Sequence, residues 1–153
     1  MVQPASIVVR LATSADQRAL CELYHQLHAA DPPWPSEAQA ADALAKVLGH
    51  ETTTILICEV DGNAVSTCML VVCPNFTRSG RPFAIIENVV THRDYRKAGY
   101  GRKVVERAIE IALQQGCYKA TLTTGRRDEE TLRFYEGLGM RRNTRTAFEA
   151  RFI

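Results

Sequence analysis

The chain has 153 residues, of which 46% are hydrophobic and 24% are charged, so it is long enough for one domain with a buried core. Its net charge of only +2 argues against a general nucleic-acid-binding protein. No apolar run approaches the roughly 20 residues of a transmembrane helix, and no basic segment of a signal peptide opens the sequence, so we expect a cytoplasmic protein that does not bind membranes.

The first third of the sequence shows two helical patterns after a short strand pattern. Residues 7–11 are predicted to form a strand, and caps at Thr13 and Ser14 begin a helix whose leucines recur at helical spacing. The proline-rich segment 31–35 ends that helix, because proline disfavours helical backbone at the residue before it. A second helix is predicted over residues 36–48.

The remaining elements alternate between strands and helices. In chain order they are a hairpin of strands 53–60 and 64–73 around an Asp61-Gly62 turn, a strand at 83–91, a helix that Gly116 closes, a strand at 118–123, a helix at 128–138 and a strand at 146–152. This order predicts a mixed α/β fold, with a mostly antiparallel central sheet flanked by about four helices. We expect a single domain over residues 1–153.

The sequence offers no convincing metal site. Its five cysteines lie within apolar segments and form no Cys-x-x-Cys pair, which predicts reduced, buried thiols. His25 and His28 are spaced for one helix face, but no third ligand is evident. We therefore predict no bound metal.

Residues 96–101, Arg-Lys-Ala-Gly-Tyr-Gly, join the strand at 83–91 to the helix that follows it. The first turn of a helix has unpaired N–H groups and the positive end of the helix dipole. Glycines let the backbone approach an anion without a Cβ in the way. The segment therefore predicts a diphosphate-binding turn, called the cradle below, although it matches neither the Walker loop nor the dinucleotide fingerprint.

The cradle sequence Arg-x-x-Gly-x-Gly resembles the acyl-CoA signature of the GNAT N-acetyltransferase superfamily. Residues 86–95 resemble that family's fourth strand and the turn after it, and residues 130–140 resemble its terminal helix with a Phe-Tyr pair. The resemblance is firm over roughly residues 83–142. It implies the same element order, acetyl-CoA as co-substrate, and a splay between the strands on either side of the cradle helix, where the pantetheine arm lies.

The resemblance also implies which residues hold the cofactor. By position, the cofactor-binding residues are Val89, Val90, Thr91, Arg96, Lys97, Ala98, Gly99, Tyr100, Gly101 and Phe134. Phe134 packs either beside the cofactor or in the core. The backbone N–H of Val90 is the predicted donor to the thioester oxygen, which would stabilise negative charge there.

Two side chains are candidates for proton transfer. Glu87 is the only acid in the strand at 83–91, and a carboxylate among apolar neighbours either serves a site or is costly. We predict that it acts as a base on the amine, directly or through water; the alternative is an exposed strand residue paired with a basic neighbour. The resemblance makes Tyr135 the acid that protonates the leaving thiolate, with a core aromatic as the alternative.

The acceptor is the least constrained part of the prediction. Residues 86–90 and 116–119 look most like glucosamine-6-phosphate N-acetyltransferases, but residues 122–124 lack the carboxylate that this subfamily carries. We therefore predict N-acetylation of a small primary amine by direct attack in a ternary complex. A protein or peptide acetyltransferase and a non-catalytic acyl-CoA sensor remain open alternatives. A homodimer is a further expectation, because the resemblance implies a family in which dimers are common.

Overall fold

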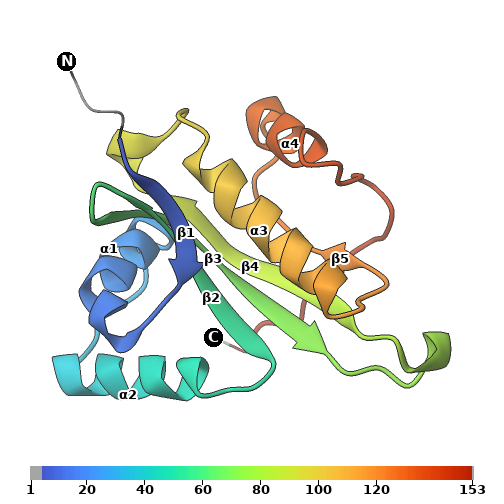
Figure 1. Cartoon of the computed structure of the whole chain (residues 1–153), viewed down its shortest axis with the longest axis horizontal. Coiled ribbons are helices and arrows are strands. Elements are labelled where there is room, and N and C mark those ends of the chain that lie inside the picture. The colour runs from blue at the N-terminus through green and yellow to red at the C-terminus, as the bar shows by residue number, and fades with distance from the viewer. Residues whose placement is uncertain (1–4, 153) are drawn as a thin grey trace. The chain divides into compact units, whose positions relative to one another are not determined.

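The computed structural model describes residues 5–152, which divide into two compact units that meet in the chain at Thr121 and Leu122. The first unit holds a five-stranded sheet in the order β1-β2-β3-β4-β5 (Figure 1). Its strands are β1 (Ile7–Leu11), β2 (Thr53–Val60), β3 (Asn63–Cys73), β4 (Phe83–Thr91) and β5 (Ala120–Thr121). All neighbours are antiparallel except β4 and β5, which are parallel.

Four α-helices accompany the sheet in the described chain. They are α1 (Gln17–Leu27), α2 (Glu37–Leu48) and α3 (Tyr100–Gln114) in the first unit and α4 (Glu129–Glu136) in the second. Three short 3₁₀ turns also form, η1 (Ser14–Asp16), η2 (Arg78–Gly80) and η3 (Arg93–Tyr95). The predicted mixed α/β class, with a mostly antiparallel sheet and four helices, is confirmed.

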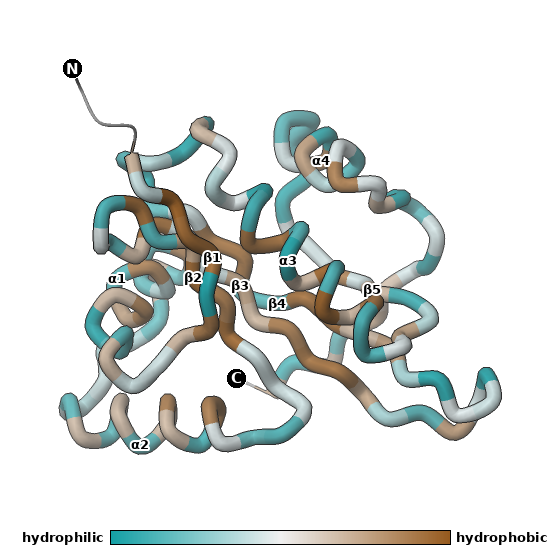
Figure 2. Tube along the Cα trace, in the orientation of Figure 1, coloured by the Kyte–Doolittle hydropathy of each residue, from teal (hydrophilic) through white to brown (hydrophobic). Residues whose placement is uncertain are grey.

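The two faces of the sheet are covered by different helices. Ile55 and Ile57 of β2 form a buried cluster with Leu20 of α1, and Leu44 of α2 packs against it. On the other face, the thiol of Cys68 donates to the carbonyl oxygen of Val104 in α3 at 3.4 Å. Figure 2 shows the apolar residues concentrated on the central strands between these layers.

The helix α3 is positioned by its apolar stripe. Val104, Val105, Ala108 and Ala112 are buried, and they recur at the spacing of one helix face, as the sequence predicts. Burying side chains of this size stabilises the packing by about 1.5–3 kcal/mol for each valine. The N-terminus of α3, which carries the cradle, is thereby fixed against the sheet.

Two predicted strands differ from the structure. The strand β5 is confined to Ala120–Thr121, because it pairs only with Ala84 and Ile85 before the parallel ladder ends. The predicted strand at 146–152 does not form, and Phe148 is 94% exposed. A strand needs a neighbour for its backbone groups, and no other strand of the described residues pairs with this segment.

No helix in residues 5–152 has the length and apolar character needed to cross a bilayer. The described chain divides into two units, each defined by its own internal contacts. That residues 1–153 form a single domain therefore stays a prediction.

Candidate active site

The strand β4 is interrupted by a bulge at Asn88. Its partner strand pairs Met69 with Glu87 and Thr67 with Val90, so one residue of β3 stands opposite two residues of β4. Asn88 has a φ of +53°, a left-handed conformation that asparagine tolerates better than most residues. A bulge of this kind bends the strand and changes which way the following groups point. The sequence-based expectation of a regular strand at 83–91 missed this bulge, although an asparagine within an apolar strand could have indicated it.

The register after the bulge fixes the direction of the backbone amides. The N–H of His92 donates to the carbonyl oxygen of Val65 at 2.8 Å. Hydrogen-bonded and non-hydrogen-bonded pairs alternate in an antiparallel ladder, so Val90 is also hydrogen-bonded to β3. The same alternation directs the N–H group of Thr91 toward the opposite edge, whereas Val89 lies in the bulge and has no directly opposite partner on β3.

That opposite edge of β4 is open beyond its first residues. The ladder with β5 ends at the pair of Ile85 and Thr121, and no other strand in residues 5–152 pairs with this edge. Residues 86–91 therefore present backbone groups that can pair with an extended ligand, much as an added strand would. The early end of the ladder agrees with the splay that the resemblance implies.

The cradle is held in two left-handed conformations. Lys97 has a φ of +65°, and Gly99, the N-cap of α3, has a φ of +83°. No side chain caps this helix at Gly99, and the first intrahelical bond runs from the N–H of Lys103 to the carbonyl oxygen of Gly99 at 3.2 Å. The N–H groups of the first turn before Lys103 have no intrahelical acceptor, so they can bind an anion.

Gly99 is required by its backbone conformation. A Cβ added there would meet no atom within 4 Å, so the positive φ rather than crowding is what requires glycine. All residues from Arg96 to Gly99 are exposed. The cradle is therefore an accessible, cation-bearing turn, which is what a diphosphate site needs.

Glu87 lies on the face of the sheet that α1 and α2 cover. It stands directly opposite Met69, and Met69 packs against the cluster of α1, α2 and β2. Opposite residues of an antiparallel pair share a face of the sheet. Glu87 as a whole residue is half-buried, so it is neither a core residue nor a fully solvated one.

The second unit contains the aromatic pair that the sequence predicts for the site. Phe134 and Tyr135 of α4 stand edge to face, with ring centroids 4.9 Å apart. Asp128 caps this helix and accepts from the N–H of Thr131 at 2.9 Å. That hydrogen bond, with a smaller contribution from Arg126, lowers the pKa of Asp128 to about 2. The proton-transfer role of Tyr135 stays a prediction.

The five cysteines are all free thiols. Cys58, Cys68 and Cys117 are buried, as predicted, whereas Cys21 and Cys73 are only half-buried, so the prediction of buried thiols is wrong for these two. Cys68 is fully buried, and burial raises its pKa to about 12, while burial also raises the pKa of Cys58. The thiols of Cys58 and Cys68 are therefore poor nucleophiles and poor metal ligands. Within residues 5–152, no group of three or more histidine, cysteine or acidic residues is arranged to hold a metal ion.

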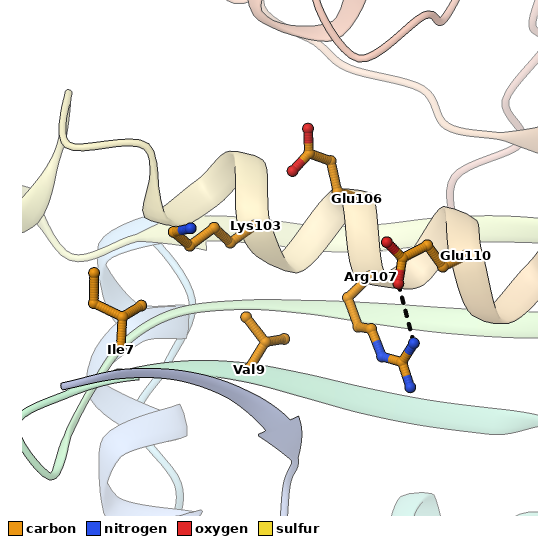
Figure 3. Close-up of a pocket in the computed structure, with 6 residues that line it drawn as sticks. All are labelled: Ile7, Val9, Lys103, Glu106, Arg107 and Glu110. Carbon is orange, nitrogen blue, oxygen red and sulfur yellow. Dashed lines mark hydrogen bonds and ion pairs between the residues drawn. The ribbon is translucent and has the colours of Figure 1, made fainter.

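One hollow in the first unit is not part of this site. A pocket of about 240 Å³ lies between β1 and α3 (Figure 3). Its lining residues are Ile7, Val9, Lys103, Glu106, Arg107 and Glu110. None of them is among the residues predicted for the cofactor or for proton transfer.

Comparison with known proteins places this geometry in a family. Residues 18–140 match the sequence profile of the acetyltransferase (GNAT) family. The chain belongs to this family. The match covers the cradle, β4 and α4, the three elements on which the predicted resemblance to GNAT proteins rests.

Individual relatives of this GNAT protein share its sequence over most of its length. It is 37% identical over 105 residues to a glucosamine 6-phosphate N-acetyltransferase of Trypanosoma brucei brucei, covering 69% of this chain and 64% of that protein. It is 32% identical over 117 residues to a rice (Oryza sativa subsp. japonica) protein assigned as glucosamine 6-phosphate N-acetyltransferase 2, covering 74% of this chain and 70% of the other. The chain thus aligns with less than two thirds of the trypanosomal protein.

A solved structure extends the likeness to nearly the whole chain. The structure of a proposed acetyltransferase from Agrobacterium tumefaciens str. C58 superposes with a TM-score of 0.90 at 41% sequence identity. The superposition covers 95% of this chain and 99% of the other. The element order of this GNAT protein is therefore shared by a relative of nearly equal length.

Proposed function

We propose that this GNAT protein is an acetyl-CoA-dependent N-acetyltransferase that acetylates a small primary amine by direct attack in a ternary complex. The observation that carries the proposal is the α3 N-terminus, where Gly99 adopts a left-handed conformation and no side chain caps the helix. This anion site follows directly on the open edge of β4. An anion site beside an unpaired strand edge matches a ligand that has a diphosphate at one end and amides along its arm.

The chain's own groups fit that ligand. Residues 96–101 would hold the diphosphate through the N–H groups of the first turn of α3. The edge formed by Val89, Val90 and Thr91 would run along the pantetheine arm. Since the register sends the Val90 N–H to β3, we assign the donor to the thioester oxygen to Val89, with Thr91 pairing further along the arm.

Acetyl-CoA, when bound, supplies an acetyl thioester. The remaining work falls to side chains that move protons. Glu87 would accept a proton from the ammonium form of the acceptor, directly or through water, because only the neutral amine has a lone pair to attack with. Its position on the α1 and α2 face would place the acceptor on that side of the sheet.

The groups of the second unit complete the proposal. The phenol of Tyr135 would supply the proton that the departing sulfur takes up, and Phe134 would pack beside the cofactor. The edge-to-face contact between the two rings restricts the orientation of both. We further propose that residues 1–153 form one domain. We also propose that the protein forms a homodimer and that it is cytoplasmic.

The acceptor class follows from the relatives. Both named relatives are assigned to glucosamine 6-phosphate, a small amine that carries a phosphate. We propose an acceptor of the same chemistry, an amino sugar or a similar amine with an anionic group. Residues 122–124 contain no carboxylate, unlike the glucosamine-6-phosphate subfamily that the sequence resembles. The test therefore includes acceptors other than glucosamine 6-phosphate.

Mass-spectrometric detection of acetylated product tests the proposal. The protein is incubated with acetyl-CoA and a panel of amino sugars, their phosphates, polyamines, amino acids, aminoglycosides and short peptides. Acetylation of a small amine is the expected result, with the amino-sugar phosphates foremost. Acetylation of peptides alone would replace the acceptor class. Binding of acetyl-CoA without any product would overturn the enzymatic proposal and leave an acyl-CoA sensor.

A further inference from the structure

The turn between β4 and α3 is tied to α1 by two side chains of that helix. The side-chain oxygen Oε1 of Gln26 accepts from the backbone N–H of Arg93 at 2.9 Å. One turn earlier on the same helix, the carboxylate of Glu22 lies 3.1 Å from Nε2 of His92. These contacts join segments that are about 70 residues apart in the chain, at separations of 67 and 70 positions.

The imidazole of His92 is fixed at both nitrogens. Its Nδ1 accepts from the backbone N–H of Asp94 at 3.3 Å, so the proton of the neutral ring lies on Nε2 and is directed to Glu22. The backbone of His92 is bonded as well, because its N–H donates to Val65 and its carbonyl oxygen accepts from Tyr95 at 2.9 Å. The turn is thus constrained by α1, by β3 and by itself.

The constrained turn leads directly into the cradle, whose backbone is strained at Lys97. Lys97, only four residues after Arg93, has a φ of +65°, which costs a non-glycine residue free energy. Such a conformation persists only when the surrounding structure determines it. Because every backbone N–H from His92 to Tyr95 except the one at Arg93 is bonded within the turn or the sheet, the Gln26 amide supplies the remaining restraint.

The side-chain amide of Gln26 is shielded from solvent at its nitrogen. Its Nε2 is buried and has no hydrogen-bond partner among the described residues. The side chain therefore acts through its oxygen, which accepts from the N–H of Arg93.

We propose that Gln26, with His92, is a positioning residue that braces the cradle from α1 and so preorganises it for the diphosphate. The inference rests on the proposed function for its ligand, and on the distances above for its geometry. Preorganisation lowers the cost of binding, since the backbone does not have to be ordered when the ligand arrives. Loss of the brace should weaken cofactor binding without removing any group that touches the cofactor.

The test compares two glutamines of the same helix. Gln26→Met keeps the size of the side chain and removes the acceptor. Gln17→Met is the matched control, because Gln17 also makes one side-chain bond to backbone, from its Nε2 to the carbonyl oxygen of Glu37 at 2.9 Å, but toward α2. Gln26→Glu retains an oxygen for Arg93 and serves as the rescue variant. Each protein is titrated with CoA by calorimetry, and hydrogen exchange is followed over residues 92–99.

We expect Gln26→Met to raise the Kd for CoA by about fivefold, the effect of one lost hydrogen bond, and to speed exchange over residues 92–99. Gln17→Met should leave the Kd within about twofold of wild type, and Gln26→Glu should restore most of the affinity. Equal weakening by both methionine variants, or unchanged exchange and Kd in Gln26→Met, would overturn the brace. If wild type itself does not bind CoA, the proposed function fails, while the exchange measurement still decides whether Gln26 braces the turn.

Discussion

The Nε of Arg96 donates to the carbonyl oxygen of Thr91 at 3.2 Å, so the first residue of the cradle is fastened to the last residue of β4. The bond spans the turn η3 and joins its two ends. Because Nε is engaged in this bond, only the two terminal nitrogens of the guanidinium can donate to a phosphate. Arg96 therefore supports the turn through this hydrogen bond, and its role as a phosphate ligand stays a prediction.

Gly99→Ala should weaken cofactor binding. The left-handed conformation at φ +83° costs a residue with a Cβ about 1–2 kcal/mol, although the added methyl would meet no neighbour. We expect a corresponding loss of stability and at least a fivefold rise in the Kd for CoA. Calorimetric titration and thermal unfolding measure the two effects.

Gly62→Ala is the control for that substitution. Gly62 has nearly the same φ, +81°, and equally open surroundings, but it lies in the turn between β2 and β3. It should lose similar stability and keep the affinity of wild type for CoA. If both variants bind CoA equally well, the conformation of Gly99 does not matter for the cofactor.

Glu87→Gln should abolish activity or move its optimum to higher pH. Without the carboxylate, the acceptor has to lose its proton to solvent, and the fraction of neutral amine grows with pH. General base catalysis contributes about 100-fold or more, so the loss at neutral pH should be of that order. Initial rates across a pH series are the measurement, with Glu51→Gln, in an exposed turn, as the control. A profile like that of wild type would exclude Glu87 as the base.

Tyr135→Phe should lower turnover by about 10- to 100-fold while the affinity for acetyl-CoA holds, because only the proton donor is removed. The ring and its contact with Phe134 stay in place. Steady-state kinetics and a CoA titration separate the two effects. Tyr118→Phe serves as the control, since that ring contacts the cations of Arg78 and Lys119 in the first unit. Unchanged turnover in Tyr135→Phe would remove the tyrosine from the mechanism.

Asp16→Asn should destabilise the protein at neutral pH and much less in acid. Asp16 is buried and accepts two hydrogen bonds from Arg10, each 2.8 Å long, and these hold its pKa below the ordinary value. A depressed pKa adds stability above the pKa of the unfolded state, about 3.9, and this stability is lost as pH falls through the folded value. The variant should lose about 2 kcal/mol at pH 7.

Urea unfolding at pH 7 and near pH 3 checks the prediction for Asp16. The difference between wild type and variant should shrink at the lower pH. Glu110→Gln is the control, because Glu110 forms an exposed pair with Arg107 at 3.0 Å, and such pairs contribute about 0–1 kcal/mol. A pH-independent difference for Asp16→Asn would show that the charge of Asp16 is not what stabilises the fold.

The elements that the sequence predicts well are those whose signals are local. The helix α3 follows from an apolar stripe at helical spacing and from Gly116, whose φ is +77°, just after its end. The strand predicted at 146–152 fails for the opposite reason. Its alternating pattern satisfied the local rule, but a strand exists only where a neighbour accepts its backbone groups.

The sequence by itself determined the class of fold, the location of the cradle and the family, because helical periodicity, glycine positions and short motifs act within a few residues. Only the tertiary structure decided which way the amides of β4 point, since the bulge at Asn88 is defined by the pairing of Thr67 with Val90. It also decided that Gln26 reaches Arg93. Both are relations between residues that are far apart in the chain, and packing brings them together where no local pattern records them.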